Sequence, residues 1–128
     1  MARLASAMVA VLISVTAPVP ARADAVDDQV ATLGNGGTYK RRLSATLGLA
    51  SSRDARAVPA LASALFAERD ASLRRVIARS LGKLLGVTAS SATRTRGLDA
   101  LRAASSNDRN AKVRAAAVTA LAESAGPS

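Results

Sequence analysis

The amino-acid sequence repeats itself, and this limits the fold more than any other feature. When the 128-residue chain is shifted by 40 positions against itself, residues 58–81 fall on residues 98–121 with apolar positions mostly on apolar positions. A shift of 34 positions brings residues 73–82 onto residues 39–48 and adds a third, partial copy. The two shifts differ by the polar stretch 86–95 (GVTASSATRT), which we interpret as a linker. Such self-similarity predicts an array of similar substructures.

Each copy has the pattern of two linked helices. In the second repeat, residues 54–85, a first helix is expected over residues 56–66, because Pro59 lies in its opening turn and apolar residues recur at positions 58, 61 and 65. Asp70 is placed to cap a second helix over residues 71–85. Composition also favours helices, because Ala and Leu dominate an apolar share of 49% while aromatic residues make up 2%.

The outer copies follow the same plan less completely. The third repeat, residues 96–124, has Asn110 as the expected cap of its second helix. The first repeat, residues 24–50, is degenerate: a weak leading helix ends at the glycine-rich stretch 34–37, and Thr38 is placed to cap a helix over residues 39–50. Because about three repeats are needed for a stable array, either residues 24–34 complete the first pair or a partner covers that end.

Several of these segments resemble HEAT repeats of the short bacterial kind. They are residues 58–61 (VPAL), 70–74 (DASLR), 81–82 (LG) and 110–114 (NAKVR), followed by Leu121. The resemblance covers residues 38–124 and implies an all-α protein, a short alpha-solenoid of about two and a half helix pairs. It also implies that the first helices form a convex face and the second helices a concave face that binds proteins or serves as a scaffold. The chain departs from the family pattern at Leu73, Lys40 and Asn110.

Residues 1–23 have the pattern of a secretory signal peptide. A short basic start precedes the apolar stretch 4–17, two prolines follow, and residues 21–23 (ARA) fit a small-x-small cleavage site. The apolar stretch is shorter than the roughly 20 residues that cross a bilayer, so we expect cleavage and an exported chain, periplasmic or secreted, without an integral membrane segment. A buried N-terminal helix is the alternative. Loss of Arg3 and Arg22 lowers the formal net charge from +9 to +7.

The basic residues divide into two sets with different expected roles. The first set, which we call the turn ladder, is expected to hold the inter-helix turns through hydrogen bonds to turn carbonyls and to carboxylates such as Asp70. It consists of Lys40, Asp70, Arg74, Asn110 and Arg114. The second set, the basic stripe, consists of Arg41, Arg75, Arg79 and Lys83, of which the last three share one helix face at i, i+4 and i+8. The stripe is either a solvated charged face or the contact surface for an acidic partner.

Composition argues against catalysis. The chain has no Cys and no His, which excludes disulfides, zinc fingers and Ser-His-Asp or Cys nucleophiles. Ser80 and Lys83 have S-x-x-K spacing, but the Ser80 position is occupied by Thr46 and Ala120 in the other copies, so core packing explains it. We therefore expect no enzyme, no cofactor and no metal site. Nucleic-acid binding is also disfavoured, because stacking aromatics are nearly absent and export is expected.

These observations predict an exported, non-enzymatic module that binds an acidic patch of a protein partner through its second helices. One alternative is electrostatic binding of an anionic envelope component, either a lipid headgroup or an acidic polysaccharide. A less favoured alternative is an accessory subunit of a HEAT-like lyase of the bilin-lyase type, which rests on fold analogy alone.

Overall fold

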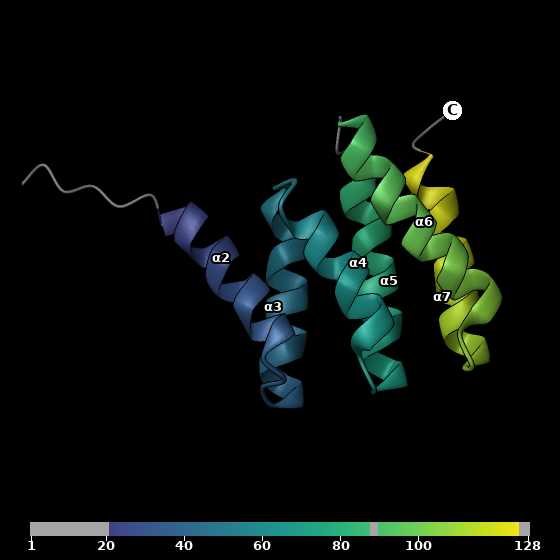
Figure 1. Ribbon diagram of the computed structural model, residues 1–128, viewed down its shortest axis with the longest axis horizontal. Coiled ribbons are helices and arrows are strands. Elements are labelled where there is room, and N and C mark those ends of the chain that lie inside the picture. The colour runs from purple at the N-terminus through teal and green to yellow at the C-terminus, as the bar shows by residue number, and fades with distance from the viewer. Residues whose placement is uncertain (1–20, 88–89, 126–128) are drawn as a thin grey trace, which may run out of the picture.

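The computed structural model describes residues 21–87 and 90–125, and in this part of the chain helices joined by short turns are the only regular secondary structure (Figure 1). In chain order its six helices are α2 (Ala21–Gly34), α3 (Tyr39–Ser52), α4 (Ala57–Ala67), α5 (Ala71–Leu85), α6 (Ser91–Asn107) and α7 (Ala111–Ser124). The all-α prediction is thus confirmed for the described residues. The expected signal peptide lies outside them except for residues 21–23, which belong to α2.

The six helices form three hairpin pairs that lie side by side. Helices α2 and α3, α4 and α5, and α6 and α7 pack as pairs. Between neighbouring pairs, α2 contacts α4 and α4 contacts α6 in one layer, while α3 contacts α5 and α5 contacts α7 in the other. Figure 1 shows the three pairs in sequence order, with α4 and α6 in front of α5 and α7. Each layer therefore exposes one broad face to solvent.

Capping residues fix where the second helix of each pair begins. The side chains of Thr38, Asp70 and Asn110 accept hydrogen bonds from backbone N–H groups in the first turns of α3, α5 and α7. Each cap satisfies donors that have no partner inside the helix. Thr38 and Asp70 are 32 positions apart, not the 34 that letter matching gave. Arg42 therefore corresponds to Arg74, and Lys40 does not.

The start of α6 differs from the expected linker, and the packing of residues 24–34 settles which of the two expected alternatives holds for the first pair. Helix α6 begins at Ser91, so the second half of the expected linker 86–95 is helical. Arg94 explains this start, because its guanidinium donates to the carbonyl oxygens of Leu85, at 2.6 Å, and of Ser124. Residues 24–34 also pack as part of α2 against α3 and α4, and Val26 is buried. The first pair is thus complete.

The core runs between the two layers through all three pairs. Leu61, Leu81 and Leu101 are fully buried, and Leu121 is partly buried against the same cluster. Helices α5 and α7 approach closely at Gly82, where an added Cβ would lie 2.7 Å from the Cα of Ala120. A side chain at Gly82 would therefore push the middle and last pairs apart.

Candidate functional site

Arg74 joins the middle pair to the last pair. Its side chain is 5% exposed and donates to both carboxylate oxygens of Asp108, with Nε at 2.9 Å and Nη2 at 3.1 Å. Its Nη1 also donates to the carbonyl oxygens of Glu68 and Arg69 in the preceding turn. This bidentate pairing fixes both the angle and the distance between the guanidinium and the carboxylate. The guanidinium thus holds its own turn and the next one together.

Arg42 makes the same connection one pair earlier. Its Nε and Nη2 donate to the carboxylate of Glu68, at 2.8 and 3.2 Å, and Nη1 donates to the carbonyl oxygen of Gly37. Glu68 and Asp108 each lie two residues before a cap and accept its backbone N–H, at 2.9 Å in both turns. The sequence reasoning missed Arg42, Glu68 and Asp108. The sequence does contain a signal for them: each arginine lies four residues after a cap, and each carboxylate lies two residues before one.

The remaining ladder residues differ from their expected roles in part. Lys40 is exposed and has no hydrogen bond or ion pair within residues 21–87 and 90–125, because Arg42 occupies the ladder position. Asp70 caps α5 instead of binding Arg74, whose carboxylate partner comes from the next pair. Asn110 caps α7 as expected. Arg114 donates to the carbonyl oxygen of Asp108, at 2.7 Å, and lies in the last pair.

The carboxyl groups of Glu68 and Asp108, which pair with Arg42 and Arg74, stay ionised despite their burial. Burial opposes ionisation of Asp108, but hydrogen bonds from Arg74 and from the backbone of Asn110, with the charge of Arg74, outweigh it and lower its pKa. The pKa of Glu68 is lowered in the same way by Arg42 and the backbone N–H of Asp70, against the effect of burial. The hydrogen bond that Arg42 donates to Glu68 also raises the pKa of Arg42. The ladder is therefore a set of charged pairs.

The basic stripe is only partly a single row. Arg75, Arg79 and Lys83, which we call the α5 row, are all exposed on the middle helix of the second layer. Arg41 is exposed as well, but it lies three residues after its cap, whereas Arg75 lies five after. Cap spacing places Leu43 and Leu47 at the positions of Arg75 and Arg79, and Leu47 is 50% exposed. The row is thus flanked on α3 by an exposed leucine.

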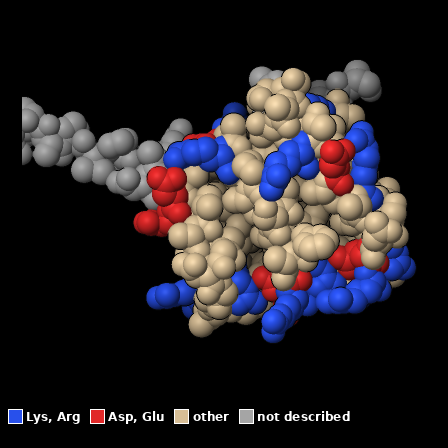
Figure 2. All heavy atoms as spheres, viewed as in Figure 1, with Lys and Arg blue, Asp and Glu red and all other residues tan. Residues whose placement is uncertain are grey.

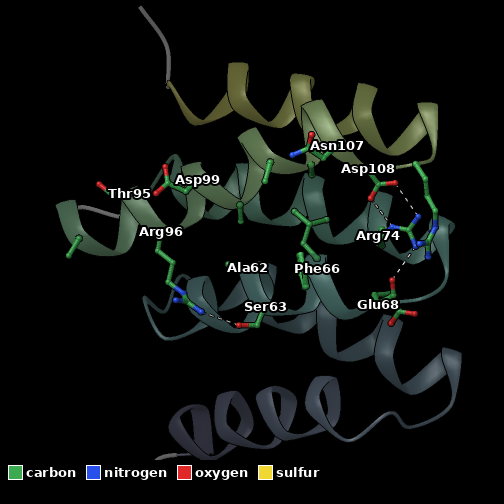
Figure 3. Close-up of a pocket in the computed structure, with 16 residues that line it drawn as sticks. Ala62, Ser63, Phe66, Glu68, Arg74, Thr95, Arg96, Asp99, Asn107 and Asp108 are labelled. Carbon is green, nitrogen blue, oxygen red and sulfur yellow. Dashed lines mark hydrogen bonds and ion pairs between the residues drawn. The ribbon is translucent and has the colours of Figure 1, made fainter.

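A groove of about 1030 Å³ lies between α4 and α6 on the opposite layer. Alanines from both helices line it, and Phe66 stands on its α4 side with 93% of the residue exposed (Figure 3). Figure 2 shows this layer: the middle of the face is mostly uncharged and hollowed, and many charged side chains lie along the edge that carries the inter-helix turns. Sequence analysis did not single out this groove, although Phe66 is the only Phe of the chain.

Searches of protein-family models, curated proteins and solved structures find no match to this chain. The site must therefore be interpreted from its own geometry. Within the described ranges, no three or more carboxylate, imidazole or thiol side chains gather where a metal ion could bind. None of the described helices combines the length and the apolar character needed to cross a membrane.

Proposed function

We propose that the protein is an exported, non-enzymatic, HEAT-like repeat module that binds an acidic patch of a protein partner through its second-helix layer. The α5 row carries this proposal. Arg75, Arg79 and Lys83 are exposed on the middle helix of that layer and have no hydrogen bond or ion pair to any described residue. By contrast, Arg42, Arg56, Arg74 and Arg102 each have a carboxylate partner within 4 Å.

The spacing of the α5 row makes it costly to the isolated protein. Like charges at i and i+4 destabilise a helix by a few tenths of a kcal/mol per pair. The row contains two such pairs, Arg75 with Arg79 and Arg79 with Lys83, and none of the ion pairs within 4 Å among the described residues involves them. Acidic side chains of a partner would remove this repulsion. Complementary charge also speeds association and selects the partner.

The solenoid architecture belongs to the same proposal. Three side-by-side helix pairs with first helices in one layer and second helices in the other support it. The repeated connection through Arg42 and Arg74 supports it further, because each links one pair to the next at the same position after the cap. In such an array the middle second helix lies at the centre of the contact surface.

Charge reversal of the α5 row tests the proposed function. The chain without residues 1–23 is immobilised and exposed to envelope proteins at roughly 50 and 200 mM salt. We expect Arg75→Glu with Arg79→Glu to lose the proteins captured by the wild type. The matched control is Arg69→Glu with Arg102→Glu, which changes the net charge equally at exposed residues outside the second layer. The control should retain them at both salt concentrations.

Anionic vesicles and acidic polysaccharide separate protein binding from the electrostatic alternative. Binding to an anionic surface depends on total charge, so both double variants should lose it equally and higher salt should abolish it. A packed protein interface weakens less with salt and depends on the position of the charges. Equal losses for the two variants would therefore reject the α5 row as a protein-binding surface.

A further inference from the structure

The exposure of Phe66 is the first observation behind a second binding site. An aromatic side chain buries more apolar area than almost any other residue, and interface anchors are enriched in such residues. Phe66 is 93% exposed, although the neighbouring Leu65 is 4% exposed in the core. The isolated fold therefore gains almost nothing from this side chain. A partner that covered it would gain its full apolar area.

The groove beside Phe66 is shaped by small residues. Ala62, Ala100, Ala103 and Ala104 line it from both helices, so small side chains leave the surface hollow above the contact between α4 and α6. Figure 3 shows Phe66 with this space between the two helices. A groove of about 1030 Å³ is at the upper end of the range for ligand sites. It therefore accommodates several apolar side chains of one partner.

Charge defines the two ends of the groove. Arg96 lies at one end, where its guanidinium contacts only the hydroxyl of Ser63, at 3.1 Å, among the described side chains (Figure 3). Arg109 lines the other end and is exposed. The acids nearby are already engaged: Glu68 by Arg42, Asp108 by Arg74 and Asp99 by Arg102. Both ends thus offer a cation to an acidic group.

A peptide segment that binds in this groove satisfies its backbone hydrogen bonds best if it is a helix. An extended peptide in a groove needs partners for its own N–H and C=O groups. The backbones of α4 and α6 are engaged in their own helices, and every buried polar side-chain atom of the described residues has a partner. A helix satisfies its backbone internally and presents only side chains. Residues 96–107 of α6 span roughly 16 Å, which corresponds to about three helical turns.

We propose that the groove between α4 and α6 binds an amphipathic helix of a partner protein, whose apolar face covers Phe66 and whose acidic residues, about three turns apart, pair with Arg96 and Arg109. This site lies on the opposite layer from the α5 row and takes a different kind of ligand. An acyl chain with one carboxylate would satisfy only one of the two arginines.

A defined peptide tests this site in the full-length protein. The probe is a fluorescein-labelled helical peptide of about 12 residues, with Glu at both ends and Leu at i, i+3, i+4 and i+7. We expect saturable binding by fluorescence anisotropy. Phe66→Ala should weaken it at least about tenfold, and so should Arg96→Glu with Arg109→Glu. Neither change touches the core, because all three residues are exposed.

Matched controls separate this site from the α5 row. Leu47→Ala removes an exposed apolar residue of the other layer, and Arg75→Glu with Arg79→Glu removes the same amount of charge there. Neither should change the affinity for the peptide, so a failure of either proposal leaves the other testable. The groove proposal is overturned if no binding occurs up to about 1 mM, if Phe66→Ala binds as tightly as the wild type, or if a scrambled peptide or oleate binds equally well.

Discussion

The middle and last helix pairs follow one sequence plan but are buried to different degrees. Ala78 of α5 is fully buried, whereas Val118, which occupies the same position after the cap in α7, is 57% exposed. Leu81 is fully buried, while its counterpart Leu121 is only partly so. The cause is the neighbourhood, because α5 packs between α3 and α7, but α7 packs against α5 and α6 only. Identical patterns thus yield different packing according to their place in the array.

The equivalent arginines of these two pairs also differ, in the groups to which they are bonded. Arg74 and Arg114 are the same residue type, four residues after their caps. Arg74 spans two pairs through the Asp108 carboxylate, whereas Arg114 is bonded to a carbonyl oxygen of its own pair. The ladder therefore derives its stabilising effect from the next pair along the chain. Five predictions test this comparison.

The largest expected effect is on the core. Leu81→Ala should lower the free energy of unfolding by about 4 kcal/mol, because it leaves a cavity in a fully enclosed site. Leu121→Ala should cost less than about 2 kcal/mol, because water and side-chain movement relieve the loss at a partly open site. Urea unfolding followed by circular dichroism measures both. Equal costs would show that the last pair is as well covered as the middle one.

Arg74→Ala is expected to cost about 3 kcal/mol, because it leaves the carboxylate of Asp108, whose side chain is only 10% exposed, without its guanidinium partner. Arg114→Ala removes a hydrogen bond to a carbonyl oxygen and should cost about 1 kcal/mol. The same urea titration distinguishes them. A cost for Arg114→Ala as large as that for Arg74→Ala would contradict the expected difference between the interactions of these two arginines.

Acid should reveal the same interaction. The pKa of Asp108 is lower in the folded than in the unfolded chain, so its stabilising effect is present above the unfolded pKa and is lost as the pH falls through the folded pKa. We expect wild-type stability to fall between about pH 5 and pH 2, and to fall less steeply in Arg74→Ala. Parallel pH profiles would show that Arg74 does not lower the pKa of Asp108.

Gly82→Ala tests the close approach of the middle and last pairs. Alanine favours a helix by roughly 1 kcal/mol over glycine, but its Cβ would lie 2.7 Å from the backbone of Ala120. We expect a net loss of about 2 kcal/mol from this overpacking. Gly48→Ala is the control, because there the added Cβ meets only the movable end of the Gln29 side chain. Thermal unfolding should show a lower Tm for the first variant alone.

The smallest effects concern the caps, and here the two pairs should behave alike. Asp70→Ala and Asn110→Ala should each cost about 1 kcal/mol, because each removes an acceptor for first-turn N–H groups of its own helix. Asp70→Asn should be nearly neutral. A cap acts locally and does not depend on the neighbouring pair. Clearly unequal costs, measured by urea unfolding, would show that the caps also depend on packing.

Local chemistry explains why helix positions were predictable. The helix expected over residues 71–85 is observed at those residues, and the helices expected over 56–66 and 39–50 are observed at Ala57–Ala67 and Tyr39–Ser52. Caps, prolines and apolar spacing act within a few residues, so the chain carries them explicitly. The linker was misjudged because α6 is fixed by Arg94, whose carbonyl partners lie in α5 and α7.

The carboxylate partners of the ladder arginines and the position of the groove could not be predicted, because they depend on residues far apart in the sequence. Letter matching placed Lys40 on the ladder, but only the cap register and the carboxylate of Glu68, 26 positions away from Arg42, identify Arg42. Likewise, Arg74 was expected to bind Asp70, and its carboxylate comes from Asp108 instead. The sequence reasoning assigned no role to Phe66, because its exposure results from the spacing between α4 and α6.

The amino-acid sequence by itself determined the helices, their caps and the leucines that face inward, because these depend on interactions within one or two helical turns. Only the tertiary structure decided which carboxylate each ladder arginine binds, how deeply equivalent residues are buried, and where a groove remains open. Those properties depend on the distance and angle between helix pairs. Small residues such as Gly82 and the alanines of α4 and α6 set that geometry through their lack of bulk.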